Sequence, residues 1–213
     1  MAFLEDYSGM VLTHGALCSL LADYRAPNFK IHSLLKEKRL IGLKKGLYVV
    51  APSAKNQLIS LPLVANHLYG PSYVSLEFAL SYYGIIPESV VEVTSVATKR
   101  SKSYETPLGR FTYQRLPSSY FSIGITQIRT SDKISYMFAS PEKALCDWLV
   151  LTPNLRIHSS KGLATLLLED MRMDEQELHN LDLNLIARIS NSGFRSSRLK
   201  FLTSCLKALQ PCQ

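Results

Sequence analysis

Basic side chains gather in one window of the sequence, residues 24–46. The window holds seven lysines and arginines against one glutamate, while the whole chain of 213 residues carries a net charge of +7. A local excess of this kind can neutralise phosphate groups, and each contact with a duplex releases counterions. A solvated helix face followed by a lysine-rich turn would give the same composition. The charge alone leaves both interpretations open.

The elements expected around this window have a recognisable order. Thr13 can cap a first helix, which buries residues spaced three and four apart: Leu17, Leu20, Leu21 and Tyr24. Asn28 can cap a second helix that runs to about Arg39. Two strand-like runs follow at 40–43 and 47–50, joined by a tight turn. Helix, turn, helix and a two-stranded wing are the order of a winged helix-turn-helix.

On a duplex, the second helix would enter the major groove while the hairpin lysines contact neighbouring phosphates. Asn28 and His32 could address base edges, and Lys30 or Lys36 a guanine. Phosphate contact is the commoner use of a lysine. The candidate DNA-binding residues are therefore Asn28, Lys30, His32, Ser33, Lys36, Arg39, Lys44 and Lys45.

The chain as a whole is expected to have an α+β fold with two domains, the winged domain at 1–55 and a second domain at 56–213. Helices are expected in the second domain at 60–69, at 76–83 and from Ser140 onward. Strands are expected at 90–93, 111–113, 123–128 and 134–138, and should form a small, mostly antiparallel sheet. A helical tail should contain three helices, at 161–171, 175–189 and 197–209.

A second cationic patch follows one of these strands. It comprises Thr98, Lys99, Arg100, Ser101 and Lys102. Such a patch can hold phosphate on RNA, DNA or a nucleotide. A charged sheet edge that prevents pairing with another sheet explains it equally well.

Two other polar groups are interpreted as structural. The Ser140 hydroxyl can cap a helix, and Pro141 and Glu142 suit the first turn. Lys143 and Asp147 would form an i, i+4 pair in it. Ser75, with Glu77, is expected to cap the helix that follows it.

Enzyme and metal chemistry find little support. The five histidines lie far apart, without the spacing of a zinc site, and no glycine-rich phosphate loop or nucleophile elbow is present. Glu88, Glu92 and Lys99 lack the spacing of a nuclease site. We therefore expect no cofactor, no metal and no enzyme activity, with a catalytic site assembled only by folding as the alternative.

The N-terminus and the cysteines bear on the compartment. Glu5 and Asp6 stand where a secretion signal would carry positive charge, and no apolar run approaches the ~18 residues of a membrane span. The four cysteines form no CxxC pair, which is typical of reduced thiols. We expect a cytoplasmic protein with no membrane partner.

Four stretches resemble, in order, the AbiEi-type antitoxins of type IV toxin-antitoxin systems. They are LKKGLYVV at 43–50, YVSLEFALSYYGIIPE at 73–88, VTSVATKRSKSYETPLGRFTYQRLP at 93–117 and ASPEKALCDWLVL at 139–151. The likeness covers about residues 10–152, and four ordered motifs are far more specific than any one of them. The remaining C-terminal third is helical by pattern only.

The resemblance implies a bifunctional protein. Its winged domain would repress its own operon by binding inverted repeats in promoter DNA, with 28–39 as recognition helix and 44–46 as wing. Its second domain would counteract a partner nucleotidyltransferase toxin, in general without a stable complex, through signatures at 75–77, 98–100 and 141–145. The candidate residues of this antitoxin domain are Thr98, Lys99, Arg100 and Lys102. Phe78 stands where the family usually has a small residue, which predicts a different surface on that helix.

Two alternatives stay open. The chain could be a protein-interaction module, in which basicity serves solubility or an acidic partner face. It could also be a plain DNA-binding regulator whose second domain binds a ligand or dimerises.

Overall fold

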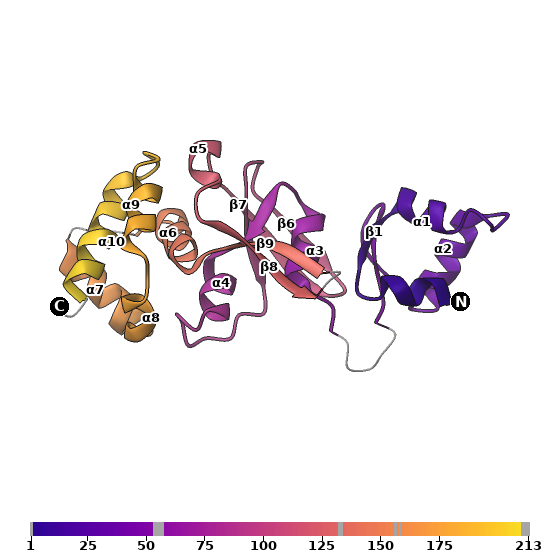
Figure 1. The fold of residues 1–213 in the computed structure, drawn as a ribbon, viewed down its shortest axis with the longest axis horizontal. Helices are drawn as coiled ribbons and strands as arrows, with labels where there is room; N and C mark the ends of the chain where they lie inside the picture. The colour runs from indigo at the N-terminus through magenta and orange to yellow at the C-terminus, as the bar shows by residue number, and fades with distance from the viewer. Residues whose placement is uncertain (1, 53–57, 132–133, 156, 158, 210–213) are drawn as a thin grey trace.

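A computed structural model describes residues 2–52, 58–131, 134–155, 157 and 159–209 of the chain. It is a mixed α+β fold with two separate sheets. Figure 1 shows an elongated molecule, with residues 2–52 (the N-terminal part) at one end. The larger sheet lies in the middle and the last helices lie at the other end, and residues from 58 onward form the C-terminal part.

The N-terminal part contains a short 3-10 helix, two α-helices and three strands. They are η1 (Ala2–Tyr7), β1 (Val11–Thr13), α1 (His14–Leu20), α2 (Pro27–Lys36), β2 (Leu40–Lys44) and β3 (Leu47–Val50). The strands form an antiparallel sheet in the order β1-β3-β2. Thr13 caps α1 as predicted, since its hydroxyl accepts a hydrogen bond from Ala16 N at 3.2 Å. The sequence does not predict β1, because three residues show no measurable alternation.

Helix α2 begins one residue before the predicted cap. Pro27 opens it, because a fixed φ and a missing N–H suit the first helical position, and Ala26 is the N-cap. Asn28, predicted as the cap, lies instead in the first turn, where its side-chain oxygen accepts a hydrogen bond from Cys18 Sγ at 3.7 Å. The helix ends at Lys36, short of the predicted end.

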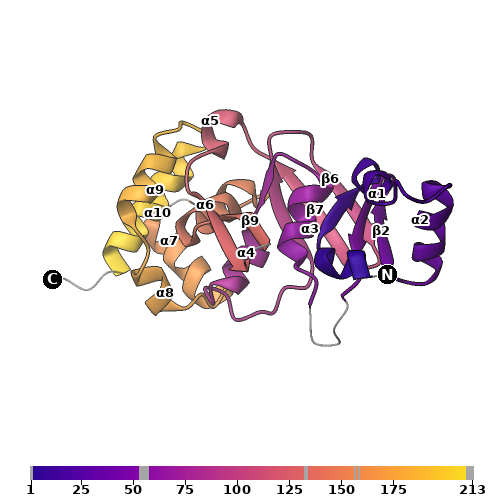
Figure 2. The same cartoon turned by 45° about the vertical axis from the view of Figure 1, so that its right-hand side comes forward.

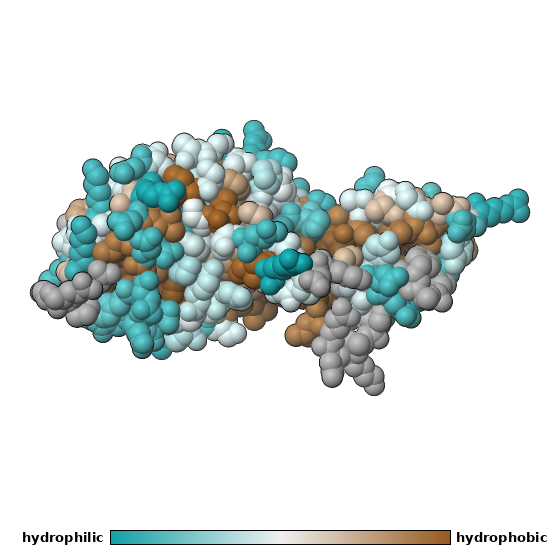
Figure 3. All heavy atoms as spheres, viewed as in Figure 1, coloured by the Kyte–Doolittle hydropathy of each residue, from teal (hydrophilic) through white to brown (hydrophobic). Residues whose placement is uncertain are grey.

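Both faces of the three-stranded sheet are buried. One face, with Leu40 and Val50, packs against α1 and α2. Leu43, Leu47 and Val49 belong instead to the large core of the C-terminal part. Figure 3 shows hydrophobic residues at the narrow waist between the two parts. The two parts therefore share buried apolar surface, and the boundary predicted near residue 55 falls outside the described residues.

The larger sheet has the strand order β6-β7-β5-β4-β9-β8. Its strands and nearby helices are α3 (Leu61–Leu68), β4 (Ser72–Val74), α4 (Leu76–Tyr82), β5 (Val93–Ala97), β6 (Lys102–Thr106), β7 (Gly109–Arg115), α5 (Ser118–Phe121), β8 (Ile125–Ser131) and β9 (Ile134–Ala139). Three neighbouring pairs are antiparallel and two are parallel, so the prediction of a mostly antiparallel sheet is confirmed. The strand predicted at 90–93 begins only at Val93, and β4 and β6 are additional.

Helices lie on both faces of the larger sheet. Tyr113 of β7 donates a hydrogen bond to Ala65 O of α3 at 2.6 Å, which places α3 on one face. Tyr73 of β4 donates to Asp147 on the opposite face. Figure 2 shows the N-terminal part beside β6 and β7, at the end of the sheet away from the last helices.

The chain ends in a helical region. Its elements are α6 (Pro141–Leu151), α7 (Ser160–Thr165), a π-helical turn η2 (Leu166–Asp170), α8 (Glu175–His179), α9 (Leu183–Ser190) and α10 (Ser196–Leu209). The single helix predicted at 175–189 is wrong, because Asp182 accepts a hydrogen bond from Asn184 N at 2.8 Å and starts a new helix. None of the helices formed by the described residues is long and apolar enough to cross a membrane.

A charged pair lies inside the C-terminal part. Lys143 Nζ and Asp147 Oδ1 of α6 are 3.2 Å apart, and both side chains are 0% exposed. Tyr73 and Ser75 donate hydrogen bonds to Asp147 Oδ2 at 2.9 and 2.7 Å, and Lys143 donates one to Tyr120 O at 2.9 Å. Burial raises the pKa of Asp147 and lowers the pKa of Lys143, and the attraction between the two charges opposes both shifts.

The contacts of four polar side chains test their structural interpretation. Ser140 caps α6 as predicted, its hydroxyl accepting from Lys143 N at 3.2 Å, and the i, i+4 pair is present. Ser75 has the N-cap position of α4, but its hydroxyl makes no bond to the helix. Its predicted capping role is wrong, because the hydroxyl donates to the buried Asp147 carboxylate.

We expect Asp147→Ala to lose ~3–5 kcal/mol of folding free energy, because it leaves the buried Lys143 ammonium without its opposite charge. The double variant Lys143→Met with Asp147→Leu removes both charges and should be more stable than the single variant. Urea unfolding followed by circular dichroism measures both. A single variant as stable as the native chain would contradict the structural role of the pair.

Candidate nucleic-acid interface

Helix α2 turns one face outward. Ile31 and Leu34 are buried with α1 and the small sheet, so the opposite side of the helix meets solvent. The residues on that side are Asn28, Phe29, His32, Ser33 and Lys36, of which only Ser33 is half-buried. Phe29, His32, Ser33 and Lys36 line a shallow hollow of about 220 Å³. We call these five residues the α2 strip.

The α2 strip combines polar groups with one cation. Asn28 is oriented by its contact with Cys18, and Ser33 donates a hydrogen bond to Glu37 Oε1 at 2.5 Å. The imidazole of His32 and the amide of Asn28 offer both donors and acceptors, and Lys36 supplies positive charge. The strip can therefore make hydrogen bonds to base edges and one phosphate contact.

Phe29 is the member of the strip that the sequence prediction omits. Its side chain is 77% exposed, which is uncommon for a large apolar residue. It stands three residues before His32 and seven before Lys36. This helical spacing was the signal that could have placed it on the outward face.

The other basic residues of the window lie elsewhere. Lys30 Nζ is 5.7 Å from the centroid of the Tyr24 ring, in the connection between α1 and α2. Arg39 follows α2 and lines a hollow of about 270 Å³ together with Leu4 and Glu5 of η1. Lys45 is exposed in the turn between β2 and β3. Lys30, Arg39 and Lys45 therefore do not lie on the α2 strip with Lys36.

Lys44 points towards the C-terminal part. Its ammonium donates a hydrogen bond to Leu68 O at the end of α3 and lies 5.6 Å from the centroid of the Tyr104 ring. The pairing of β2 with β3 shifts register between Gly42 and Lys44, and a bulge of this kind redirects a side chain. Lys44 and Lys45, both predicted to contact phosphates, therefore do not project together from the hairpin.

The second cationic patch lies where β5 leads to β6. Lys99 donates a hydrogen bond to Gly70 O at 2.6 Å, and Lys102 Nζ is 4.8 Å from the centroid of the Tyr104 ring. Arg100 is exposed, and Thr98 is half-buried. Lys102 starts β6, an edge strand, so the protection of a sheet edge and the binding of phosphate both remain good explanations.

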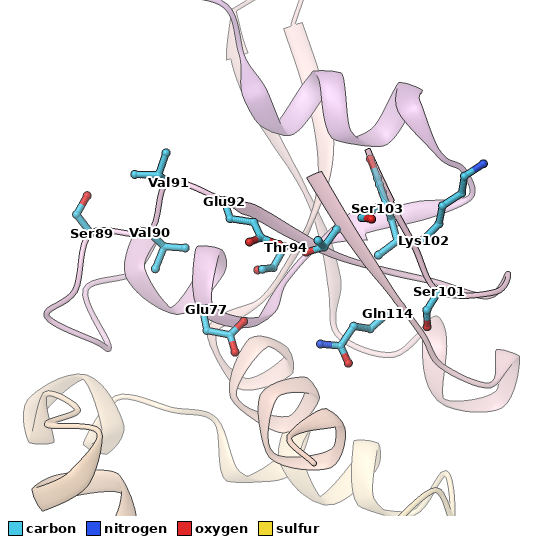
Figure 4. Close-up of a pocket in the computed structure, with 12 residues that line it drawn as sticks. Glu77, Ser89, Val90, Val91, Glu92, Thr94, Ser101, Lys102, Ser103 and Gln114 are labelled. Carbon is cyan, nitrogen blue, oxygen red and sulfur yellow. The ribbon is translucent and has the colours of Figure 1, made fainter. Parts of the chain in front are cut away.

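A separate cleft of about 880 Å³ lies over β5, β6 and β7 (Figure 4). Glu77 of α4 and Glu92 line it, together with the hydroxyl groups of Thr94, Ser101, Ser103 and Thr112. Lys102 also lines the cleft, but Figure 4 shows its ammonium pointing away from the two carboxylates. Because these carboxylates repel anions, the cleft suits a neutral or cationic polar molecule better than a phosphate.

Metal ligands do not gather in the part of the chain that the structure describes. No group of three or more His, Cys, Asp or Glu side chains there could hold a metal ion.

Neither a protein-family model nor a curated protein matches the sequence. Among solved structures, the chain is similar to the RV2827C protein from Mycobacterium tuberculosis, with 15% sequence identity and a TM-score of 0.49. The alignment covers 95% of this chain and 77% of that chain. The name of that protein gives no activity, ligand or partner.

Proposed function

We propose that the chain is a DNA-binding autorepressor and antitoxin. Its N-terminal part binds double-stranded promoter DNA, and its C-terminal part counteracts a partner nucleotidyltransferase toxin without forming a stable complex. The observation that carries the DNA-binding half is the outward α2 strip. The antitoxin half rests on the resemblance of four stretches to AbiEi-type antitoxins.

The order of elements supports a winged helix-turn-helix. η1 precedes the sheet strand β1, α1 and α2 follow, and the β2–β3 hairpin completes the sheet. In such domains the second helix of the pair enters the major groove and presents the outward side chains of its first turns to base edges. Asn28, Phe29 and His32 occupy those positions in α2.

Single observations favour the two alternatives. The cleft lined by Glu77 and Glu92 favours a DNA-binding regulator whose C-terminal part binds a small polar ligand. The exposed rings of Phe29 and Tyr24, 77% and 39% exposed, favour a protein-interaction surface. DNA binding accounts better for the strip, because its apolar ring is surrounded by His32, Ser33 and Lys36.

We expect Lys36→Glu to weaken binding to the chain's own upstream DNA about tenfold and to lower the slope of log affinity against log salt by about one. The charge reversal removes one phosphate contact and adds repulsion. Fluorescence anisotropy at several salt concentrations measures both quantities. The matched control is Lys200→Glu on α10, an exposed lysine with the same change in net charge. Equal effects of the two variants would remove the α2 strip from the interface.

Phe29 should contact the methyl group of a thymine, since an exposed apolar side chain in the major groove has that partner. Replacing the thymines of the bound site by uracil, one at a time, removes only a methyl group each time. We expect one of these replacements to weaken binding of the native chain several-fold. The same replacement should leave the affinity of Phe29→Ala unchanged. Tyr82→Ala, which removes an exposed ring from α4, is the control and should respond like the native chain. A native chain that tolerates every replacement would exclude this contact.

The antitoxin half calls for a test in the full-length chain, because Leu43, Leu47 and Val49 cover apolar surface that a C-terminal fragment would expose. We expect co-expression of the native chain with its proposed nucleotidyltransferase toxin to restore the growth of cells that the toxin arrests. Lys36→Glu should restore growth equally while failing to repress the operon. Colony counts and a promoter reporter measure the two activities. Absence of protection by the native chain would refute the antitoxin role and leave DNA binding standing.

A further inference from the structure

Three lysine ammonium groups gather around two neighbouring tyrosine rings at the junction of the two parts. The rings are Tyr69, which follows α3, and Tyr104 of β6, with centroids 6.1 Å apart. Lys102 Nζ lies 4.8 Å from the Tyr104 centroid and 5.9 Å from the Tyr69 centroid. Lys44 lies 5.6 Å from Tyr104, and Lys99 lies 5.8 Å from Tyr69. We call the three lysines the junction lysines.

Protein carboxylates do not neutralise this cluster. Among the residues that the structure describes, no ion pair joins Lys44, Lys99 or Lys102 to a carboxylate. The tyrosine faces attract each ammonium by about 0.5–1 kcal/mol at an exposed site. That attraction leaves three positive charges, each within 6 Å of the centroid of one of these two rings, so an anion placed among them would be stabilised.

The junction lysines keep hydrogen-bond donors for such an anion. An ammonium group has three N–H donors. Lys44 gives one to Leu68 O and Lys99 gives one to Gly70 O at 2.6 Å, which fixes both nitrogens at the end of α3. Their remaining donors are available because all three lysines are exposed. A tetrahedral phosphate can accept hydrogen bonds from several of them at once.

The cluster draws its lysines from both parts of the molecule. Lys44 belongs to β2 of the N-terminal part, whereas Lys99 and Lys102 belong to the C-terminal part. Any anion that contacts all three therefore links the two parts. The sheet that carries Lys44 lies between this cluster and α2, since its opposite face packs against α1 and α2.

We infer that Lys44, Lys99 and Lys102 form one binding site for a phosphate ester, and that the bound phosphate holds the two parts together. The site is distinct from the α2 strip and does not depend on duplex recognition by α2. The phosphate can come from a nucleic-acid backbone or from a free nucleotide, since both present the same tetrahedral oxygens.

Binding of four probes to the full-length chain tests this inference: inorganic phosphate, ATP without metal, a single-stranded RNA and a duplex DNA. Calorimetry serves the small probes and fluorescence anisotropy the large ones. We expect at least one probe to bind. Lys99→Gln with Lys102→Gln should weaken its affinity about tenfold or more. Lys44→Gln, which changes the N-terminal part, should weaken its affinity several-fold. Lys44→Arg should retain more of the affinity than Lys44→Gln, because it keeps the positive charge and N–H donors. The bound probe should raise the unfolding midpoint of the native chain by more than that of Lys44→Gln at the same probe concentration.

Three comparisons decide the outcome. Lys161→Gln with Lys200→Gln removes two exposed lysines from α7 and α10 and should change affinity less than twofold. The inference would be overturned if this control lost as much affinity as Lys99→Gln with Lys102→Gln. It would also be overturned if Lys44→Gln kept its full affinity, or if none of the probes bound. Lys36→Glu separates it from the proposed function: this variant should bind the small probes normally and lose only the α2 contact with duplex DNA. Which probes bind identifies the source of the phosphate.

Discussion

The packing of the three-stranded sheet between two sets of apolar partners fixes where the α2 strip and Lys44 lie relative to the C-terminal part. Leu43, Leu47 and Val49 are buried in the core of the C-terminal part, and burial of each such side chain contributes ~1.5–3 kcal/mol. Leu40 and Val50 face the other way, towards α1 and α2. A sheet buried on both faces holds its helices and its hairpin in one arrangement. That arrangement leaves the α2 strip outward and directs the exposed Lys44 side chain towards the C-terminal part.

The stretches that resemble antitoxins divide between interior and surface. Ser75, Lys143 and Asp147 are buried, and both Ser75 and Lys143 are bonded to Asp147. These residues stabilise the fold, because they join α6 to the start of α4. Lys99 and Lys102 lie at the surface and can meet another molecule. A resemblance in sequence therefore points to binding chemistry only at the exposed positions, and the buried ones explain why the fold requires their residue types.

Features that depend on neighbours in sequence are predictable from this chain, and features that depend on distant partners are not. The caps at Thr13 and Ser140 and the pair of Lys143 with Asp147 involve residues three or four apart, and all are present. Ser75 fails as a cap because its partner is 72 residues away. Lys44 points towards the C-terminal part because of a bulge and a carbonyl group in α3, neither of which has a signature in the window itself. The break at Asp182 was readable in principle, since aspartate competes well for an N-cap position.

The division of the basic window changes what duplex binding must rely on. The candidate DNA-binding residues included five basic side chains, whereas the α2 strip contains one lysine, and the small sheet separates it from the junction lysines. Because each phosphate contact contributes about 0.9 to the salt dependence of log affinity, a strip with one or two contacts gives weak, only mildly salt-dependent attraction. Sequence-specific binding must then come from the base contacts of Asn28, Phe29 and His32, or from two copies of the chain on an inverted repeat. Strong binding with a steep salt dependence would instead require further cations, such as the exposed Lys45 of the hairpin or the junction lysines, to reach the same duplex.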